Sequence, residues 1–192
     1  MRFKVNFFSI MLFLSLLFTE GWSIFFIILP AILHEGGHFV AAYARGIKVR
    51  EMNVTIMGAR ITLAGCYSYI DEFIISLCGP LVNLVSVYIA NMCIRSYTDT
   101  TVLYDFLNAS LSLAITNLLP IKSFDGGRMI QCILSNIFDS SVVNSIISVT
   151  SFIALFSVWC ISVYFLLRLN SSLSVFVFSI SMFANIFITK SI

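Results

Sequence analysis

The two histidines of this chain, His34 and His38, are four residues apart, and Glu35 directly follows the first. In an α-helix, residues four positions apart leave the same face, so both imidazoles could bind one divalent metal ion. The pattern H-E-x-x-H adds a glutamate beside the pair, where a general base for a metal-activated water is needed. The motif therefore predicts a hydrolytic metal centre with His34 and His38 as ligands.

The alternative is that the two histidines have a purely structural role. The surrounding segment, residues 22–44, is apolar enough to span a bilayer. Ionised groups inside a membrane cost about 2–3 kcal/mol each on insertion scales, so they are retained there mainly for function. We therefore favour the metal centre over a structural pair.

Composition predicts a membrane protein. Hydrophobic residues make up 59% of the chain, charged residues only 10%, and the mean hydropathy is +1.01. Soluble domains carry about 25% charged residues. The lipid bilayer is thus an expected partner, whereas the scattered basic residues exclude nucleic acid. The 5 cysteines are odd in number and lack C-x-x-C spacing, so we expect apolar packing residues.

The chain divides into about six apolar segments, each close to the roughly 20 residues that a transmembrane helix needs. We predict an all-α polytopic membrane protein, a single domain over residues 1–192, with spans at about 5–20, 22–44, 73–94, 102–120, 142–168 and 172–189. The first segment has a second interpretation as a cleavable signal peptide, because small residues flank Trp22.

Basic residues predict the orientation. Arg2 and Lys4 precede the first span, and Arg45 and Lys48 follow the second. Because Lys and Arg concentrate in cytoplasmic loops, both termini are expected in the cytoplasm. At about 1.5 Å per residue, His38 then lies about 10 Å inside the cytoplasmic boundary at Arg45.

The longest polar stretch, residues 45–72, has an alternating rather than a helical pattern. Apolar residues alternate with polar ones on both sides of residues 57–59, which predicts a membrane-associated β-hairpin between the second and third spans. The hairpin is either a connector or an exposed edge that pairs with an extended substrate segment.

A catalytic zinc ion generally takes three protein ligands, so the histidine pair needs a third donor. Asp125 follows a segment in which Pro120 breaks the fourth span and a glycine pair begins at Gly126. Membranes tolerate such irregular backbone only where it lines a protein cavity, which favours Asp125 as the third ligand. The alternative to Asp125 is a glutamate as the third ligand, as in a different kind of membrane zinc peptidase. Glu72 is then the best candidate.

Three motifs in order resemble the site-2 protease family of intramembrane zinc metalloproteases. They are H-E-x-G-H at residues 34–38, G-P-x-x-N at residues 79–83, and N-x-x-P followed by D-G at residues 117–126. The chain is most similar to the short six-span branch that processes sporulation pro-sigma factors. This form lacks a PDZ insertion, and the resemblance implies a location in the bacterial cytoplasmic membrane. Some close relatives carry a nucleotide-sensing domain, but no sequence remains for it after Ile192, so we expect neither domain.

The resemblance also implies roles for individual residues. His34, His38 and Asp125 would bind Zn²⁺, Glu35 would be the general base, and Asn117 would orient the scissile carbonyl or stabilise its oxyanion. Other motif residues would shape packing and the substrate-facing loop: Gly37, Gly79, Pro80, Asn83, Pro120 and Gly126. The chain departs from the family pattern at Lys122 and Ser123, where prolines are common.

The expected function is zinc-dependent cleavage of a membrane-embedded or membrane-associated substrate near its cytoplasmic end, after local unwinding of the substrate helix. By the resemblance, the substrate would be a pro-sigma factor or another regulator, and a separate membrane protein would control the enzyme. The alternative is a metal-ion transporter or sensor that uses the same His/Asp cluster. That alternative gives Glu35 no role, and the internal repeats typical of transporters are not found.

Overall fold

The computed structural model describes residues 2–5, 24–55, 58–65, 67–96 and 101–169. The predicted sixth span and nearly all of the first, including its interpretation as a signal peptide, lie outside these residues. The described elements, in chain order, are β1 (Arg2–Val5), α2 (Ile24–Ala44), β2 (Lys48–Thr55), β3 (Gly58–Ala64), α3 (Tyr69–Ile94), α4 (Thr101–Leu118), α5 (Asp125–Ser135) and α6 (Ser140–Leu169).

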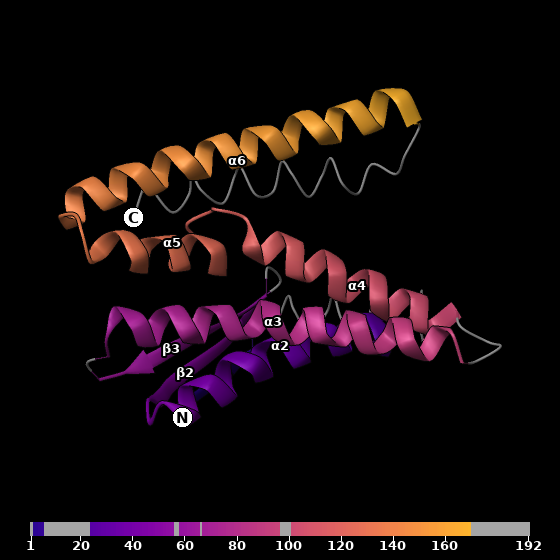
Figure 1. Cartoon of the computed structure of the whole chain (residues 1–192), viewed down its shortest axis with the longest axis horizontal. Coiled ribbons are helices and arrows are strands. Elements are labelled where there is room, and N and C mark those ends of the chain that lie inside the picture. Colours follow the sequence, from indigo (N-terminus) through magenta and orange to yellow (C-terminus); the bar gives the residue numbers. More distant parts are fainter. Residues whose placement is uncertain (1, 6–23, 56–57, 66, 97–100, 170–192) are drawn as a thin grey trace.

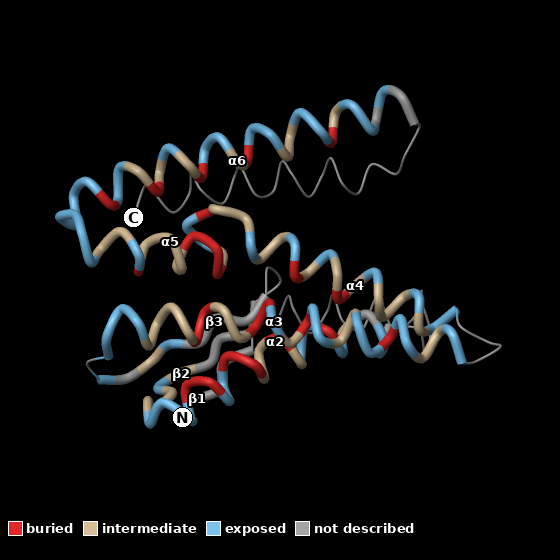
Figure 2. The backbone as a smooth tube through the Cα atoms, in the orientation of Figure 1, coloured by how far each residue is buried: buried red, intermediate tan, exposed pale blue. Residues whose placement is uncertain are grey.

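Helix α3 is the central element of the described fold, since it packs against α2, α4 and α5. Helix α5 in turn contacts α6, which lies on the outer side of the assembly (Figure 1). Figure 2 shows buried backbone, in red, where α2, α3 and the start of α5 face one another. The site is therefore positioned mainly by α2, α3 and α5.

Two described helices are long and apolar enough to cross a membrane. Residues Tyr69–Ile94 have a mean hydropathy of 2.0 and residues Ser140–Phe165 one of 2.2. At about 1.5 Å per residue, each exceeds the roughly 30 Å of a bilayer's hydrocarbon core. Large apolar side chains also point outward, such as Val40 at 65% and Leu167 at 76% exposed. These features agree with the composition, which predicts a membrane protein.

Helix α3 begins at Tyr69, four residues before the predicted start, because Ser68 caps it. The Ser68 hydroxyl accepts a hydrogen bond from the Asp71 backbone N–H at 3.1 Å, and the Asp71 carboxylate accepts one from the Ser68 N–H at 3.1 Å. This reciprocal capping box satisfies two N–H groups that the helix leaves unpaired. Arg45, just beyond α2, also pairs with Asp71 and ties the two helix ends together.

The predicted hairpin is present as β2 and β3, which pair antiparallel. The sheet has a third strand that we did not predict: β1 pairs parallel with β2, giving the order β1-β2-β3. A parallel pair requires a long crossover, and here it runs through α2. The sheet packs on the helices through Val49 and Leu63, which contact a buried cluster of Ala41, Ala42 and Ile75.

The predicted break before Asp125 lies between α4 and α5. The Lys122 backbone N–H donates to Ser151 Oγ at 2.9 Å, which anchors the loop to α6. The structure differs from the prediction at the end of the break, because residues 125–127, where irregular backbone was expected, form the first turn of helix α5. Glycine weakens a helix in isolation, but at Gly126 and Gly127 it lets the helix start directly beneath the loop's carbonyl groups.

Candidate metal centre

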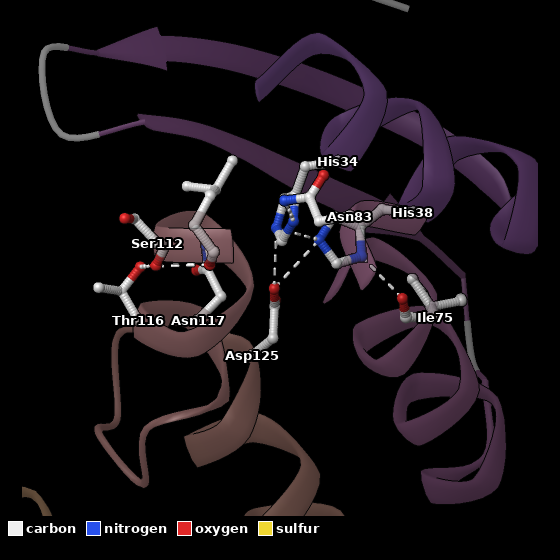
Figure 3. Close-up of polar contacts among 9 residues, drawn as sticks. His34, His38, Ile75, Asn83, Ser112, Thr116, Asn117 and Asp125 are labelled. Atoms are coloured by element: carbon white, nitrogen blue, oxygen red, sulfur yellow. Dashed lines mark hydrogen bonds and ion pairs between the residues drawn. The ribbon is translucent and has the colours of Figure 1, made fainter. Parts of the chain in front are cut away.

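Three side chains from two helices meet at one point. His34 and His38 come from adjacent turns of α2, and Asp125 is the first residue of α5. Asp125 Oδ2 lies 3.1 Å from His34 Nε2 and 3.2 Å from His38 Nε2, and the two Nε2 atoms are 3.2 Å apart (Figure 3). All three residues are buried, at 4%, 7% and 6% exposed.

This arrangement fits a metal ion. One ligand atom from each residue lies within 4.8 Å of the others, and no other such group occurs among the described residues. Donors about 2.0–2.2 Å from a tetrahedral zinc ion lie roughly 3.3–3.6 Å apart, slightly more than the 3.1–3.2 Å seen here. When both Nε2 atoms are unprotonated, two nitrogen lone pairs and a carboxylate meet in a buried space, and a cation between them would stabilise the cluster.

The His38 ring is held from its far side. Its Nδ1–H donates to the Ile75 backbone carbonyl of α3 at 2.7 Å. A proton on Nδ1 leaves Nε2 with a free lone pair directed at Asp125 and His34. Such outer contacts commonly orient metal-ligating histidines.

Glu35 is not part of this ligand group. It follows His34 on α2, so its side chain leaves the helix about 100° around the axis. The residue is half-buried and interacts electrostatically with the ligand residues and with Arg128 on α5. This position beside the ligands suits a base that acts on water rather than a ligand.

Two glycines allow α2 and α3 to approach each other at the site. A Cβ atom on Gly37 would lie 2.8 Å from the Cys78 carbonyl oxygen and 2.9 Å from Val82 Cγ2. A Cβ atom on Gly79 would overlap the His38 ring. Both predicted packing glycines therefore lie where only a glycine fits without displacement.

The other residues predicted from the motifs lie in the helices and the loop around the ligand group. Pro80 is buried in α3 next to Gly79, and Pro120 lies in the loop before α5. A Cβ atom on Gly126 would overlap the Leu118 carbonyl, so α5 packs tightly under the end of α4. Asn117 Nδ2 donates to the Leu113 carbonyl of its own helix at 3.0 Å, outside the contacts that join the ligands (Figure 3).

Glu72, the alternative third ligand, is not in the ligand group. It lies in the first turn of α3, and its negative charge adds to the effect of burial in raising the pKa of the Cys132 thiol to about 11. Helix α5, which carries Cys132, is too short to span a bilayer. A thiol with so high a pKa is neutral near pH 7, which agrees with a packing role for this cysteine.

Some residues at the site have no clear signal in the sequence. The Ile75 contact uses a backbone carbonyl, which no side-chain pattern reveals. Arg128 stands directly after the Asp-Gly-Gly sequence, and this position in the first turn of α5 is the one clue to its proximity to Glu35. Asn83 approaches His34 from α3, although its motif indicated only helix packing.

Comparisons with known proteins find similarity to zinc metalloproteases. The model of peptidase family M50 matches residues 95–161, a range that contains Asp125 but not the histidine motif. A zinc metalloprotease of Methanocaldococcus jannaschii is 29% identical over 121 residues, which cover 59% of this chain. The matched part spans 35% of that relative's length.

A solved structure shares the fold. The site-2 protease from Methanocaldococcus jannaschii superposes with a TM-score of 0.65 at 20% sequence identity, over 94% of this chain and 86% of that one. Of the three residues of the ligand group, the range matched by the family model contains Asp125 alone. Together with the motifs, these findings confirm the predicted resemblance to the site-2 protease family.

Proposed function

We propose that this chain is an intramembrane zinc-dependent endopeptidase. The observation that carries the proposal is the convergence of His34 Nε2, His38 Nε2 and Asp125 Oδ2 at 3.1–3.2 Å from one another in a buried position. The names of the relatives, a zinc metalloprotease and a site-2 protease, support the same assignment.

Each site residue has a role in peptide hydrolysis. His34, His38 and Asp125 would hold the zinc ion, which when bound supplies Lewis acidity that polarises a peptide carbonyl and acidifies water. Glu35 accepts the proton of the attacking water and transfers it to the leaving amine, so that one water yields a carboxylate end and an amine end. Asn117 remains our candidate for orienting the carbonyl, after a rotation of its side chain away from Leu113.

The proposed substrate is a membrane-embedded or membrane-associated peptide, cut near its cytoplasmic end. A transmembrane helix hides its peptide groups in its own hydrogen bonds, so the substrate must extend before cleavage. Strand β3 has no further strand partner among the described residues, and its edge is our candidate for binding the extended segment. We further propose that the protein has six membrane spans and that both termini lie in the cytoplasm. Its substrate would be a regulator such as a pro-sigma factor, and a separate membrane protein would control the enzyme.

Glu35→Gln tests this function because it removes the base and leaves the ligands in place. We expect the purified variant to bind zinc like the unaltered protein, as measured by elemental analysis, and to lose proteolysis by about 10²–10⁴-fold. In cells, quantitative membrane proteomics should then show uncut substrates accumulating. Glu72→Gln serves as the matched control and should retain both zinc and proteolysis.

The same variants test the alternatives. A metal transporter would keep zinc uptake into proteoliposomes when Glu35 is replaced, and it would accumulate no uncut peptides. That outcome, or full proteolysis by Glu35→Gln, would overturn the proposed peptidase. Loss of zinc from Glu72→Gln would instead favour a glutamate as the third ligand. The comparisons do not favour a transporter.

A further inference from the structure

Asn83 has an unexplained position beside the metal centre. It is completely buried in α3, and its carboxamide nitrogen lies 3.2 Å from His34 Nδ1 (Figure 3). Its carboxamide oxygen is also buried and has no hydrogen-bond partner among the described residues. A buried unpaired polar atom costs about 1–3 kcal/mol, so a role in packing alone does not account for it.

The chemistry of a metal-binding imidazole explains which atom of the Asn83 carboxamide should face His34. A neutral imidazole that binds metal through Nε2 carries its proton on Nδ1, and this proton needs an acceptor. His38 has such an acceptor in the Ile75 carbonyl at 2.7 Å. For His34, the group in the equivalent place is the Asn83 carboxamide, whose oxygen is the atom without a partner.

A half-turn about the Asn83 Cβ–Cγ bond gives the His34 Nδ1–H an acceptor, and the carboxamide NH2 group then takes the buried position that the oxygen held. The oxygen and nitrogen of a carboxamide have nearly the same size, and the rotation exchanges their positions. The oxygen then lies about 3.2 Å from His34 Nδ1 and accepts its N–H. Metal binding would select this orientation, because it fixes the His34 tautomer.

We propose that Asn83 is a positioning residue for the metal centre and holds His34 in the tautomer whose Nε2 faces the metal. This inference rests on the metal centre of the proposed function. Helix α3 would then orient both ligand rings from one face, since Ile75, Gly79 and Asn83 follow at intervals of four residues. The Ile75 carbonyl orients His38, Gly79 leaves room for its ring, and Asn83 orients His34.

Metal affinity of the purified full-length protein tests the proposal. Asn83→Leu keeps the approximate volume but removes the acceptor, and we expect zinc affinity in a chelator competition to fall about 10–100-fold. Asn83→Asp offers a carboxylate acceptor in the same place and should restore affinity to near the original value. Ser110→Ala is the control, because Ser110 Oγ is also buried and without a partner among the described residues.

A spectroscopic measurement separates positioning from general destabilisation. With Co²⁺ in place of zinc, Asn83→Leu should alter the visible ligand-field bands, whereas Asn83→Asp and Ser110→Ala should keep the original spectrum. If Asn83→Leu folds, binds zinc as tightly as the unaltered protein and keeps that spectrum, the inference is wrong. If the unaltered protein binds no zinc, the proposed function fails instead.

The unaltered protein provides a test that does not depend on the folding of a variant. In zinc-loaded protein labelled with ¹⁵N-histidine, nuclear magnetic resonance distinguishes a protonated ring nitrogen from a metal-bound one. We expect both histidines to carry a proton on Nδ1. A His34 ring that lacks this proton would overturn the proposal.

Discussion

Two neighbouring glycines of the histidine motif have different surroundings, which permits a controlled test of close helix packing. A Cβ atom on Gly37 would approach the Cys78 carbonyl to 2.8 Å, whereas one on Gly36 would meet nothing within 4 Å. Gly37→Ala should force α2 away from α3, lower the free energy of unfolding by about 1–3 kcal/mol and weaken zinc binding.

Gly36→Ala is the matched control, one residue away in the same helix. Alanine favours a helix over glycine by about 0.5–1 kcal/mol, so this variant should be as stable as the unaltered protein or slightly more stable. Thermal unfolding in detergent, with zinc content measured on the same samples, compares the two. Equal losses in both variants would contradict the role assigned to Gly37.

The ligand residues give a second prediction. Asp125→Ala removes one of the three donors, so zinc affinity should fall by more than the roughly 10–100-fold expected for an outer contact. Glu72→Ala should leave zinc affinity unchanged, since Glu72 is outside the ligand group. Isothermal titration of the metal-free proteins provides the measurement, and the reverse pattern would refute the ligand assignment.

At the residue scale, the sequence predicted the three side chains that converge but not the groups that contact the two histidine rings from α3. The spacing of His34 and His38 specifies one helical face, and the break before Asp125 suggested a backbone that turns into a cavity. The contact between Asn83 and His34 depends on how α2 packs on α3, which one-dimensional periodicity does not encode. The backbone carbonyl of Ile75 has no residue signature at all.

At the scale of elements, the start of α3 is set by a few polar groups at its first turn. Ser68→Ala would remove the hydroxyl that accepts from the Asp71 N–H at 3.1 Å, and loss of such a cap costs about 0.5–2 kcal/mol. Ser86→Ala in the same helix removes only a hydroxyl that donates to the Val82 carbonyl at 2.8 Å, and should cost less than about 0.5 kcal/mol.

The comparison of these two serine variants measures the cap separately from the general effect of losing a hydroxyl. Thermal unfolding of the purified proteins should show a lower midpoint for Ser68→Ala alone. Because Asp71 also pairs with Arg45, the weakened cap should loosen the junction between α2 and α3 at this end of the site. A midpoint that falls equally in both variants would mean that the cap contributes nothing specific.

Helices and strands were predictable where hydrophobic periodicity or a turn-forming residue marked them in the sequence. The helix boundaries near Ala44 and Leu118 agree with the predicted spans, and the predicted hairpin is present, although Gly58 and Ala59, expected in its turn, already belong to β3. Strand β1 escaped prediction because four residues carry too little periodicity, and its parallel partner lies far along the chain. Helix α5 escaped because its glycine pair resembles a loop in sequence alone.

At the scale of the whole molecule, the position of the metal centre along α3 indicates which membrane face the centre is nearer. Its 26 residues extend about 39 Å, which is long enough to place its two ends near opposite faces of a bilayer. The metal-centre contacts of α3 run from Ile75 to Asn83, nearer its first residue, Tyr69, than its last, Ile94. The proposed topology therefore predicts that the α2–β2 turn, close to the site, faces the cytoplasm.

Cysteine labelling in intact cells tests this topology. In a variant with the native cysteines replaced, a cysteine at Ser96, after α3, should react with a membrane-impermeant maleimide added outside. A cysteine at Lys48, after α2, should react only once the cells are opened, because the basic residues around it favour the cytoplasm. Zinc content should match the original in both, which verifies the fold. External labelling at Lys48 but not at Ser96 would mean that the protein has the opposite orientation in the membrane. The proposed cleavage near the cytoplasmic end of the substrate would then be wrong as well.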